Sequence, residues 1–181
     1  MIRNKNGEKS ESERLAAFDE LEMIVEGIDN ASNMDKMNLW PEIFSCISPD
    51  ESVEVVKFAL WIIGTCAQNN PETQAALLHK HDIFSRLLAV WSAVPESHAK
   101  VMYCLSALLS NNPAGLEDFI TRSGFAVIEK FDGNEQVAKK LKFLLCTVLG
   151  KEIGLDAVRC LVKECPKLIE IMDSPDSSDE E

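Results

Sequence analysis

Residues 61–78, WIIGTCAQNNPETQAALL, align without a gap on residues 103–120, YCLSALLSNNPAGLEDFI, at a constant separation of 42 positions. The alignment places the Asn-Asn-Pro of 69–71 on the Asn-Asn-Pro of 111–113. A fixed period of this length indicates a repeat protein, in which each unit buries its apolar faces against its neighbours. The repeat therefore decides the fold class before any single helix is assigned.

The same period extends in both directions from these two segments. A further shift of 42 brings Lys100 onto Lys142, which indicates a third and more diverged unit. A backward shift of about 40 brings residues 29–30 under residues 69–70. The chain is therefore expected to open inside a partial unit and to contain three to four units.

Within a unit the apolar residues follow a helical period. Between Glu54 and Gln68 they fall at positions 55, 58, 59, 62, 63 and 66, which is the spacing of one buried helix face. The Asn-Asn-Pro sequence then ends this helix, because Asn tolerates left-handed backbone angles and Pro suits only the first turn of the next helix. A long, a short and a medium helix are expected to alternate.

Three helices in about 42 residues are typical of the armadillo architecture, and HEAT repeats, with two helices per unit, are the alternative. No window alternates apolar and polar residues over a strand length. We predict an all-α, armadillo-like, right-handed superhelical solenoid. Its helices are predicted at 12–28, 38–47, 51–69, 71–80, 83–93, 96–110, 114–122, 124–131, 134–150, 153–163 and 166–172.

Composition predicts the domain organisation. Residues 1–13 are polar and are expected to be a disordered N-terminus, followed by an armadillo-repeat domain over 14–173. Residues 174–181, SPDSSDEE, are acidic and of low complexity, so they bury too little apolar surface to offset the entropy of ordering them. Ser177 and Ser178 precede acidic residues, as in sites of acidophilic kinases.

Charge and cysteine content limit the partners and the compartment. The net charge of −12 opposes binding to nucleic acid or anionic lipid, so a protein partner is expected and the chain is expected to be a monomer. No stretch reaches the roughly 18 apolar residues of a membrane span, and no apolar signal segment opens the chain. The six cysteines lie among apolar residues and are read as buried thiols of a cytoplasmic protein.

The sequence offers no catalytic constellation. It contains no Walker, GxGxxG, GxSxG, HExxH or EF-hand motif. His79 and His81 flank Lys80 at a helix end, where a solvated turn is favoured over a metal pair. We therefore expect a binding protein that is not an enzyme and that needs no cofactor or metal.

The long helices offer the candidate binding surface. Peptide-binding armadillo proteins carry a Trp followed four residues later by an Asn on this helix, so that ring and amide are neighbours on one face. Here the equivalent pairs are Trp61 with Thr65, Tyr103 with Ala107, and Leu145 with Leu149. The aromatic positions partly survive and the Asn positions do not, which favours a cradle for a folded domain over a peptide groove. Trp61 and Tyr103 fit either a core or a partner surface.

Three segments resemble one known family. AFDELEMIVEGIDNASNMDKMNLWPEI (17–43), ALWIIGTCAQNNPETQ (59–74) and KVMYCLSALLSNN (100–112) are similar to the Fes/HspBP family of armadillo nucleotide-exchange factors for heat-shock protein 70. The resemblance implies that the concave face holds one lobe of the chaperone's ATPase domain, opens the nucleotide cleft and speeds the release of ADP. An armadillo adaptor or peptide-binding scaffold without exchange activity is the alternative.

The resemblance also implies site residues. The loop Asp29-Asn30-Ala31 matches a family segment near the chaperone contact, and Ala31 stands where a small residue allows close approach. Lys140 matches a position on the third long helix where the family typically has Arg, and Lys keeps the charge without the bidentate fork. The N-terminal segment of the family that competes for the chaperone's substrate site is short here, which puts assistance in substrate release in doubt.

Overall fold

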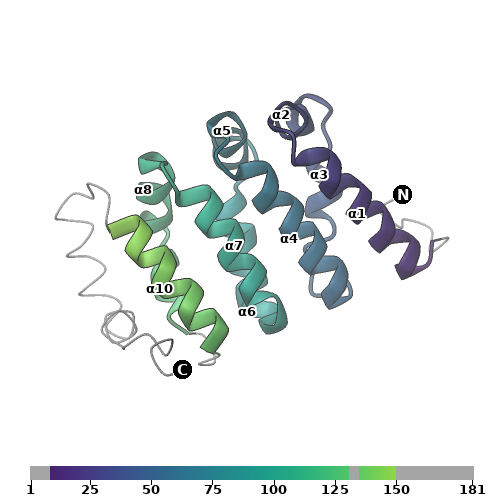
Figure 1. Cartoon of the computed structure of the whole chain (residues 1–181). Coiled ribbons are helices and arrows are strands. Elements are labelled where there is room, and N and C mark those ends of the chain that lie inside the picture. The colour runs from purple at the N-terminus through teal and green to yellow at the C-terminus, as the bar shows by residue number, and fades with distance from the viewer. Residues whose placement is uncertain (1–8, 131–134, 150–181) are drawn as a thin grey trace, which may run out of the picture.

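A computed structural model of the protein describes residues 9–130 and 135–149, and all of the regular structure in these residues is helical (Figure 1). The elements follow one another with few residues between them. They are α1 (Glu11–Val25), α2 (Ile28–Lys36), α3 (Trp40–Phe44), α4 (Val53–Ala67), α5 (Pro71–His79), α6 (Ile83–Ala93), the 3₁₀ helix η1 (Pro95–Ser97), α7 (His98–Leu109), α8 (Pro113–Thr121), α9 (Gly124–Ile128) and α10 (Glu135–Leu149).

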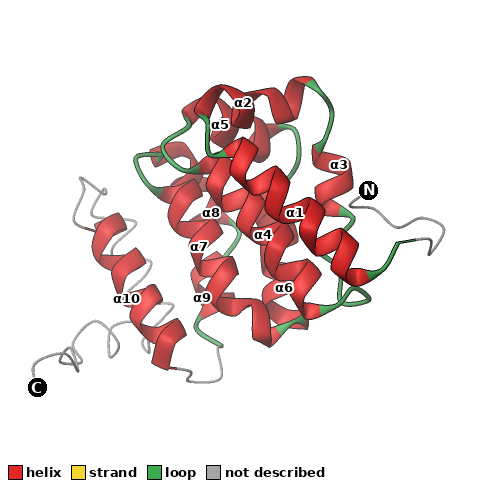
Figure 2. Ribbon diagram, turned by 45° about the vertical axis from the view of Figure 1, so that its right-hand side comes forward, coloured by secondary structure: helices red, strands yellow, loops and turns green. Residues whose placement is uncertain are grey.

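The long helices α1, α4, α7 and α10 stand side by side as one layer, with α2, α5 and α8 along one edge (Figure 1). The remaining helices α3, α6 and α9 cover one side of this layer and leave its opposite side exposed, as the turned view also shows (Figure 2). Each long helix packs directly on the next. The armadillo-like all-α fold is thereby confirmed, with α1 as the partial opening unit and α4, α7 and α10 each closing a three-helix unit.

The Asn-Asn-Pro boundaries work as the sequence predicts. Asn69 has a φ of 53° and Asn111 has a φ of 55°, so the first Asn of each pair takes the left-handed conformation that ends the long helix. The second Asn caps the next helix, because Asn70 Oδ1 accepts the Thr73 N–H at 3.2 Å. The proline then occupies the first position of α5 and of α8.

The core lies between the long-helix layer and the shorter helices. Phe18 of α1 is fully buried and stacks on Phe58 of α4, with ring centroids 6.0 Å apart. The Cys104 thiol of α7 donates a hydrogen bond to the Leu60 carbonyl of α4 at 2.8 Å. The long helices of successive units therefore contact one another directly, so stability comes from the stacking of units.

The predictions for residues 26–36 were wrong. The predicted helix 12–28 ends at Val25, and the predicted loop at 29–31 is part of helix α2. Helix α2 forms because Ala31 and Met34, three residues apart, are both 2% exposed and bury the same helix face. The first residue of α2, Ile28, corresponds to Pro71 of α5, so the backward shift is 43 (71 − 28) and residues 29–30 do not correspond to 69–70.

The other described helices begin and end within about three residues of the predicted positions. Residues 11–13, assigned to the polar N-terminus, form the first turn of α1. The predicted helices at 153–163 and 166–172 and the acidic tail lie outside the described residues. In the part of the chain that the structure describes, no helix has the length and apolar character needed to cross a membrane.

Candidate functional site

The candidate site is the exposed side of α4, α7 and α10, here called the long-helix face. It carries four of the residues predicted for partner binding: Trp61 and Thr65 on α4, Tyr103 on α7 and Lys140 on α10. Residues on the same side of parallel helices become neighbours only when the units stack. The fold therefore brings these four residues onto one surface, which the sequence repeat could only suggest.

Trp61 is half-buried and belongs both to the packing and to the surface. Its ring packs against Phe58 with centroids 5.7 Å apart. On its other side, Lys100 Nζ lies 4.1 Å from the centre of the ring, in a cation–π contact. Partial burial lowers the pKa of Lys100, because removal from water disfavours the charged form. Trp61 therefore takes part in the packing and still has part of its side chain at the surface, where its role in partner binding stays a prediction.

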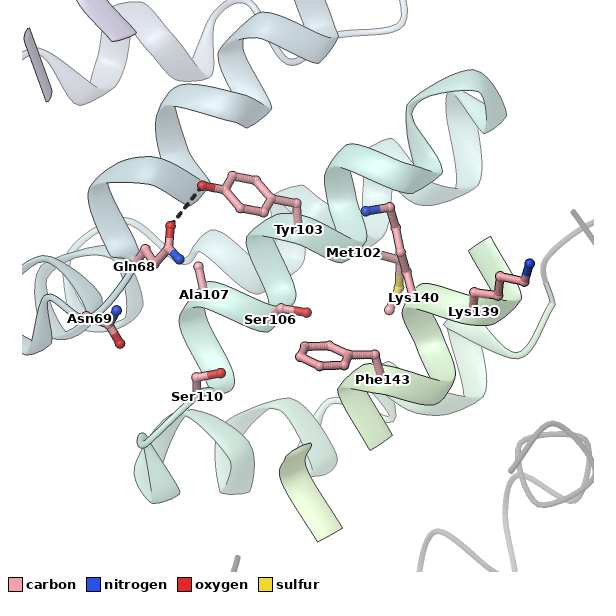
Figure 3. A pocket seen from close by; sticks show the side chains of 10 residues that line it. All are labelled: Gln68, Asn69, Met102, Tyr103, Ser106, Ala107, Ser110, Lys139, Lys140 and Phe143. Carbon is pink, nitrogen blue, oxygen red and sulfur yellow. Dashed lines mark hydrogen bonds between the residues drawn. The ribbon is translucent and has the colours of Figure 1, made fainter. Parts of the chain in front are cut away.

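Tyr103 lies against α4 through its ring and its hydroxyl. The ring covers Gly64, whose missing side chain provides the space. The hydroxyl lies 3.3 Å from Thr65 Oγ1 and donates to Gln68 Oε1 at 3.2 Å (Figure 3). Thr65 Oγ1 in turn donates to Glu22 Oε1 of α1 at 3.3 Å. Polar contacts thus connect α1, α4 and α7 along the long-helix face.

The three contacts of Thr65 and Tyr103 cannot all be hydrogen bonds at the same time. Two hydroxyl hydrogens, those of Thr65 and Tyr103, serve the three contacts, so two of the contacts are made at any one time. Burial raises the pKa of the Tyr103 hydroxyl, which therefore stays protonated at neutral pH. It can act as a hydrogen-bond donor to a partner that displaces Gln68.

A groove of about 500 Å³ lies between the C-terminal end of α4, the C-terminal half of α7 and the middle of α10, here called the α7–α10 groove. Figure 3 shows Phe143 pointing from α10 toward Ser106 and Ser110 of α7. Phe143 is 68% exposed. The lining residues are Gln68, Asn69, Met102, Tyr103, Ser106, Ala107, Ser110, Lys139, Lys140 and Phe143.

The predicted segment 29–31 is not part of this face. It lies on α2, at the edge of the molecule and toward the end opposite α10 (Figure 1). The Asn30 side chain donates to the Ile24 carbonyl at 2.9 Å and so ties α2 to the end of α1. Ala31 is covered by its own chain, so its side chain is not available to a partner, whereas Asp29 and Asn30 are exposed.

Sequence reasoning missed Gln68, Lys100 and Phe143. Gln68 lay inside the segment 59–74 that carries the family resemblance, which is a signal that could have selected it. Phe143 gave no such signal. Its equivalent one unit earlier, Val101, is fully buried, so the repeat would place Phe143 in the core and not at the surface. Among the described residues, no three His, Cys, Asp or Glu side chains form a group that could hold a metal ion.

These features define a helical-repeat scaffold whose long-helix face carries Trp61, Tyr103 and Lys140. Residues 1–34 match the family model described as nucleotide exchange factor Fes1. The chain is 40% identical over 139 residues to the Hsp70 nucleotide exchange factor FES1 of Mycosarcoma maydis, a match that covers 76% of this chain and 36% of that protein. These matches confirm the resemblance to the Fes/HspBP family.

Two further relatives carry the same name. The protein of Cryptococcus neoformans is 35% identical over 153 residues, which cover 77% of this chain and 40% of that protein. The protein of Schizosaccharomyces pombe is 35% identical over 142 residues, which cover 75% of this chain and 48% of that protein. The chain therefore spans less than half the length of each of these three relatives.

Proposed function

We propose that the chain is a co-chaperone that binds the ATPase domain of heat-shock protein 70 and accelerates the release of ADP. The observation that carries this proposal is the 40% identity over 139 residues to a protein named as an Hsp70 nucleotide exchange factor. The all-helical repeat adds support, because it offers a broad surface for a folded domain.

The mechanism requires no covalent step. A factor that binds the open and the closed forms of the ATPase domain equally well shifts nothing, so the long-helix face must bind the open form more tightly. A preference of about 100-fold corresponds to about 2.7 kcal/mol of shift toward the open form. The face supplies this energy through surface contacts, and the chain acts as a binding protein and not as an enzyme.

Trp61, Tyr103 and Lys140 are the proposed contacts on the long-helix face. Half-buried aromatic residues lose little entropy on binding, and they often contribute most of the energy of an interface. Lys140 provides a charge that an acidic surface can pair with. Asp29 and Asn30 are kept as a second, peripheral contact, and Ala31 acts only as a packing residue beneath them.

A receptor for basic peptides is disfavoured on this surface. Such a receptor needs acidic groups and Asn amides, whereas Thr65 and Ala107 occupy the two Asn positions of α4 and α7. We place the protein in the cytoplasm as a monomer, without nucleic acid or membrane partners, in line with its net charge of −12.

The test is stopped-flow release of a fluorescent ADP from the chaperone's isolated ATPase domain. The wild-type chain is expected to accelerate release at least about tenfold at saturation. Lys140→Glu is expected to lower the affinity about tenfold, because it replaces an attraction by a repulsion. The matched control, Lys36→Glu, changes the same charge on α2 and should leave release unchanged. No acceleration by the wild-type chain would refute the proposed function.

A further inference from the structure

The α7–α10 groove differs in charge from the chain as a whole. The sequence carries 30 acidic and 18 basic residues, yet the groove is lined by Lys139 and Lys140 and by no acidic residue of the described chain. Lys139 pairs with Glu135 at 2.9 Å. Lys140 has no ion pair within residues 9–130 and 135–149. The charge of Lys140 is therefore available to pair with an anionic ligand.

The groove also combines polar and apolar groups in a way that suits an extended peptide. The Asn69 amide and the hydroxyls of Ser106 and Ser110 line one side. The exposed Phe143 ring faces the two serines from the other side (Figure 3). Amide and hydroxyl groups can donate to main-chain carbonyls, and the ring can cover apolar parts of a peptide such as a proline. The charge of Lys140 selects an acidic peptide.

Residues 173–181 of this chain, DSPDSSDEE, have this chemistry. They contain five carboxylates, one proline and no basic residue. We propose that this segment binds in the α7–α10 groove of its own chain, with its carboxylates on Lys140 and its proline against Phe143. The segment then covers part of the long-helix face.

The distance along the chain permits this contact. Residues 150–172 connect the end of α10 to the segment, and a chain of this length spans up to about 75 Å when fully extended. Helix α10, with 15 residues, is about 22 Å long. A tethered segment also experiences an effective concentration of about a millimolar, so that even a weak site is occupied.

The consequence is a competition on the long-helix face, and this consequence alone rests on the proposed function. A partner that contacts Lys140 must first displace the acidic segment. The apparent affinity of the chain for this partner would then be the intrinsic affinity multiplied by the fraction of molecules whose groove is empty. The binding of the segment itself can be measured without any chaperone, so failure of one proposal is distinguishable from failure of the other.

The experiment uses a fluorescent synthetic peptide, DSPDSSDEE, and fluorescence anisotropy at low salt. It compares the 181-residue wild-type chain with a tail-neutral variant of the same length, in which Asp173, Asp176 and Asp179 become Asn, and Glu180 and Glu181 become Gln. The tail-neutral variant is expected to bind the peptide at least about fivefold more tightly, because its groove is free. Binding should weaken several-fold between 50 and 300 mM salt, roughly as screening of exposed charges requires.

Two further substitutions in the tail-neutral variant locate the site. Lys140→Glu should weaken peptide binding at least about fivefold, because the pairing charge is reversed. Lys36→Glu makes the same charge change on α2 and should leave the affinity unchanged within about twofold. A peptide with the five acids replaced by amides should not bind measurably to either chain.

Three results would overturn the inference. The first is equal affinity of the wild-type and tail-neutral chains for the peptide, or no binding to the tail-neutral chain. The second is an equal effect of Lys140→Glu and Lys36→Glu, which would place the peptide elsewhere. The third is a wild-type dimer, seen by sedimentation and absent for the tail-neutral chain, which would show that the segment binds a second copy.

Discussion

The ring of Tyr103 on α7 lies so close to Gly64 on α4 that a Cβ atom added to residue 64 would collide with Tyr103 Cδ1 and Cε1. Real Cβ atoms do not approach other atoms so closely, so the two helices depend on the missing side chain. The contact also sets the position of the Tyr103 hydroxyl beside Thr65.

Gly64→Ala is expected to destabilise the chain by up to about 2 kcal/mol. The overpacking cost is about 1–3 kcal/mol, and the better helix propensity of Ala offsets about 1 kcal/mol of it. In a Tyr103→Ala background the clash is absent, so Gly64→Ala should instead stabilise by about 1 kcal/mol. Urea unfolding followed by circular dichroism measures both values. The same sign in both backgrounds would contradict the contact.

Ala31→Arg is expected to disrupt folding and not a partner contact. Ala31 is 2% exposed, so the arginine must displace neighbours or bury its charge, at a cost of at least about 2 kcal/mol. Asn33→Arg, two residues further on an exposed side of α2, is the control and should stay within about 0.5 kcal/mol. Thermal unfolding distinguishes them. An unchanged midpoint for Ala31→Arg would show that position 31 is open to solvent.

Glu51→Gln is expected to lower the free energy of unfolding by about 1–3 kcal/mol. Arg14 is 8% exposed, and its two terminal nitrogens donate to the two carboxylate oxygens of Glu51 at 2.7 and 2.9 Å. The hydrogen bond to Glu51 raises the pKa of Arg14. Arginine stays charged at neutral pH even without a carboxylate partner, so Glu51→Gln leaves a mostly buried charge facing a neutral amide.

The matched control for this substitution is Lys36→Gln. It removes a solvent-exposed ion pair, Lys36 to Glu72 at 3.6 Å, which is expected to matter by less than about 1 kcal/mol. Equal effects of the two substitutions in urea unfolding would contradict a special role for the bidentate pair.

Asp35 is expected to contribute stability that is lost only in acid. Hydrogen bonds from Lys80, and then from His81, lower the pKa of Asp35 below its ordinary value of 3.8. A lowered pKa in the folded state means that the contribution is fully present above the unfolded-state pKa and disappears as the pH falls through the folded-state pKa. The difference in unfolding free energy between wild type and Asp35→Asn should therefore be constant near pH 5 and shrink below pH 4. A difference that does not change down to pH 2.5 would contradict the shift.

Cys146 is expected to be the first to react among the four cysteines in the described residues. It is exposed on α10, whereas Cys46, Cys66 and Cys104 are buried. Burial also raises the pKa of Cys66 to about 12, so almost no thiolate forms there at pH 8. Alkylation with iodoacetamide, read by peptide mass spectrometry, should modify Cys146 at least about tenfold faster than these three. Comparable rates would indicate that the long-helix layer opens in solution.

Most of the fold could be predicted because its signals are local. The apolar period of α4, together with the left-handed Asn69 and the helix-starting Pro71, places the long helices and their ends from neighbouring residues alone. Helix α2 could not be predicted in this way. Its sequence, IDNASNMDK, is rich in residues that prefer turns and caps, and it becomes helical because Ala31 and Met34 are buried in the apolar core of the folded chain.

The candidate site was predictable in part. Trp61 and Tyr103 were selected by their repeat positions, and Lys140 by the family resemblance. Neither signal could reveal that Phe143 is exposed at a position whose equivalent is buried, or that Lys100 covers the Trp61 ring. Such pairs join residues about 40 positions apart, and no local pattern encodes their contact.

The sequence by itself determined the 42-residue period, the helix boundaries at the Asn-Asn-Pro segments and the family that the chain resembles. These follow from backbone preferences and apolar spacing, which act within a few residues. The tertiary structure alone decided which side chains form the long-helix face and that Ala31 is buried. It also decided that Lys140, which has no ion pair within the described residues, lines the α7–α10 groove, because only the stacking of successive units brings residues of different helices together.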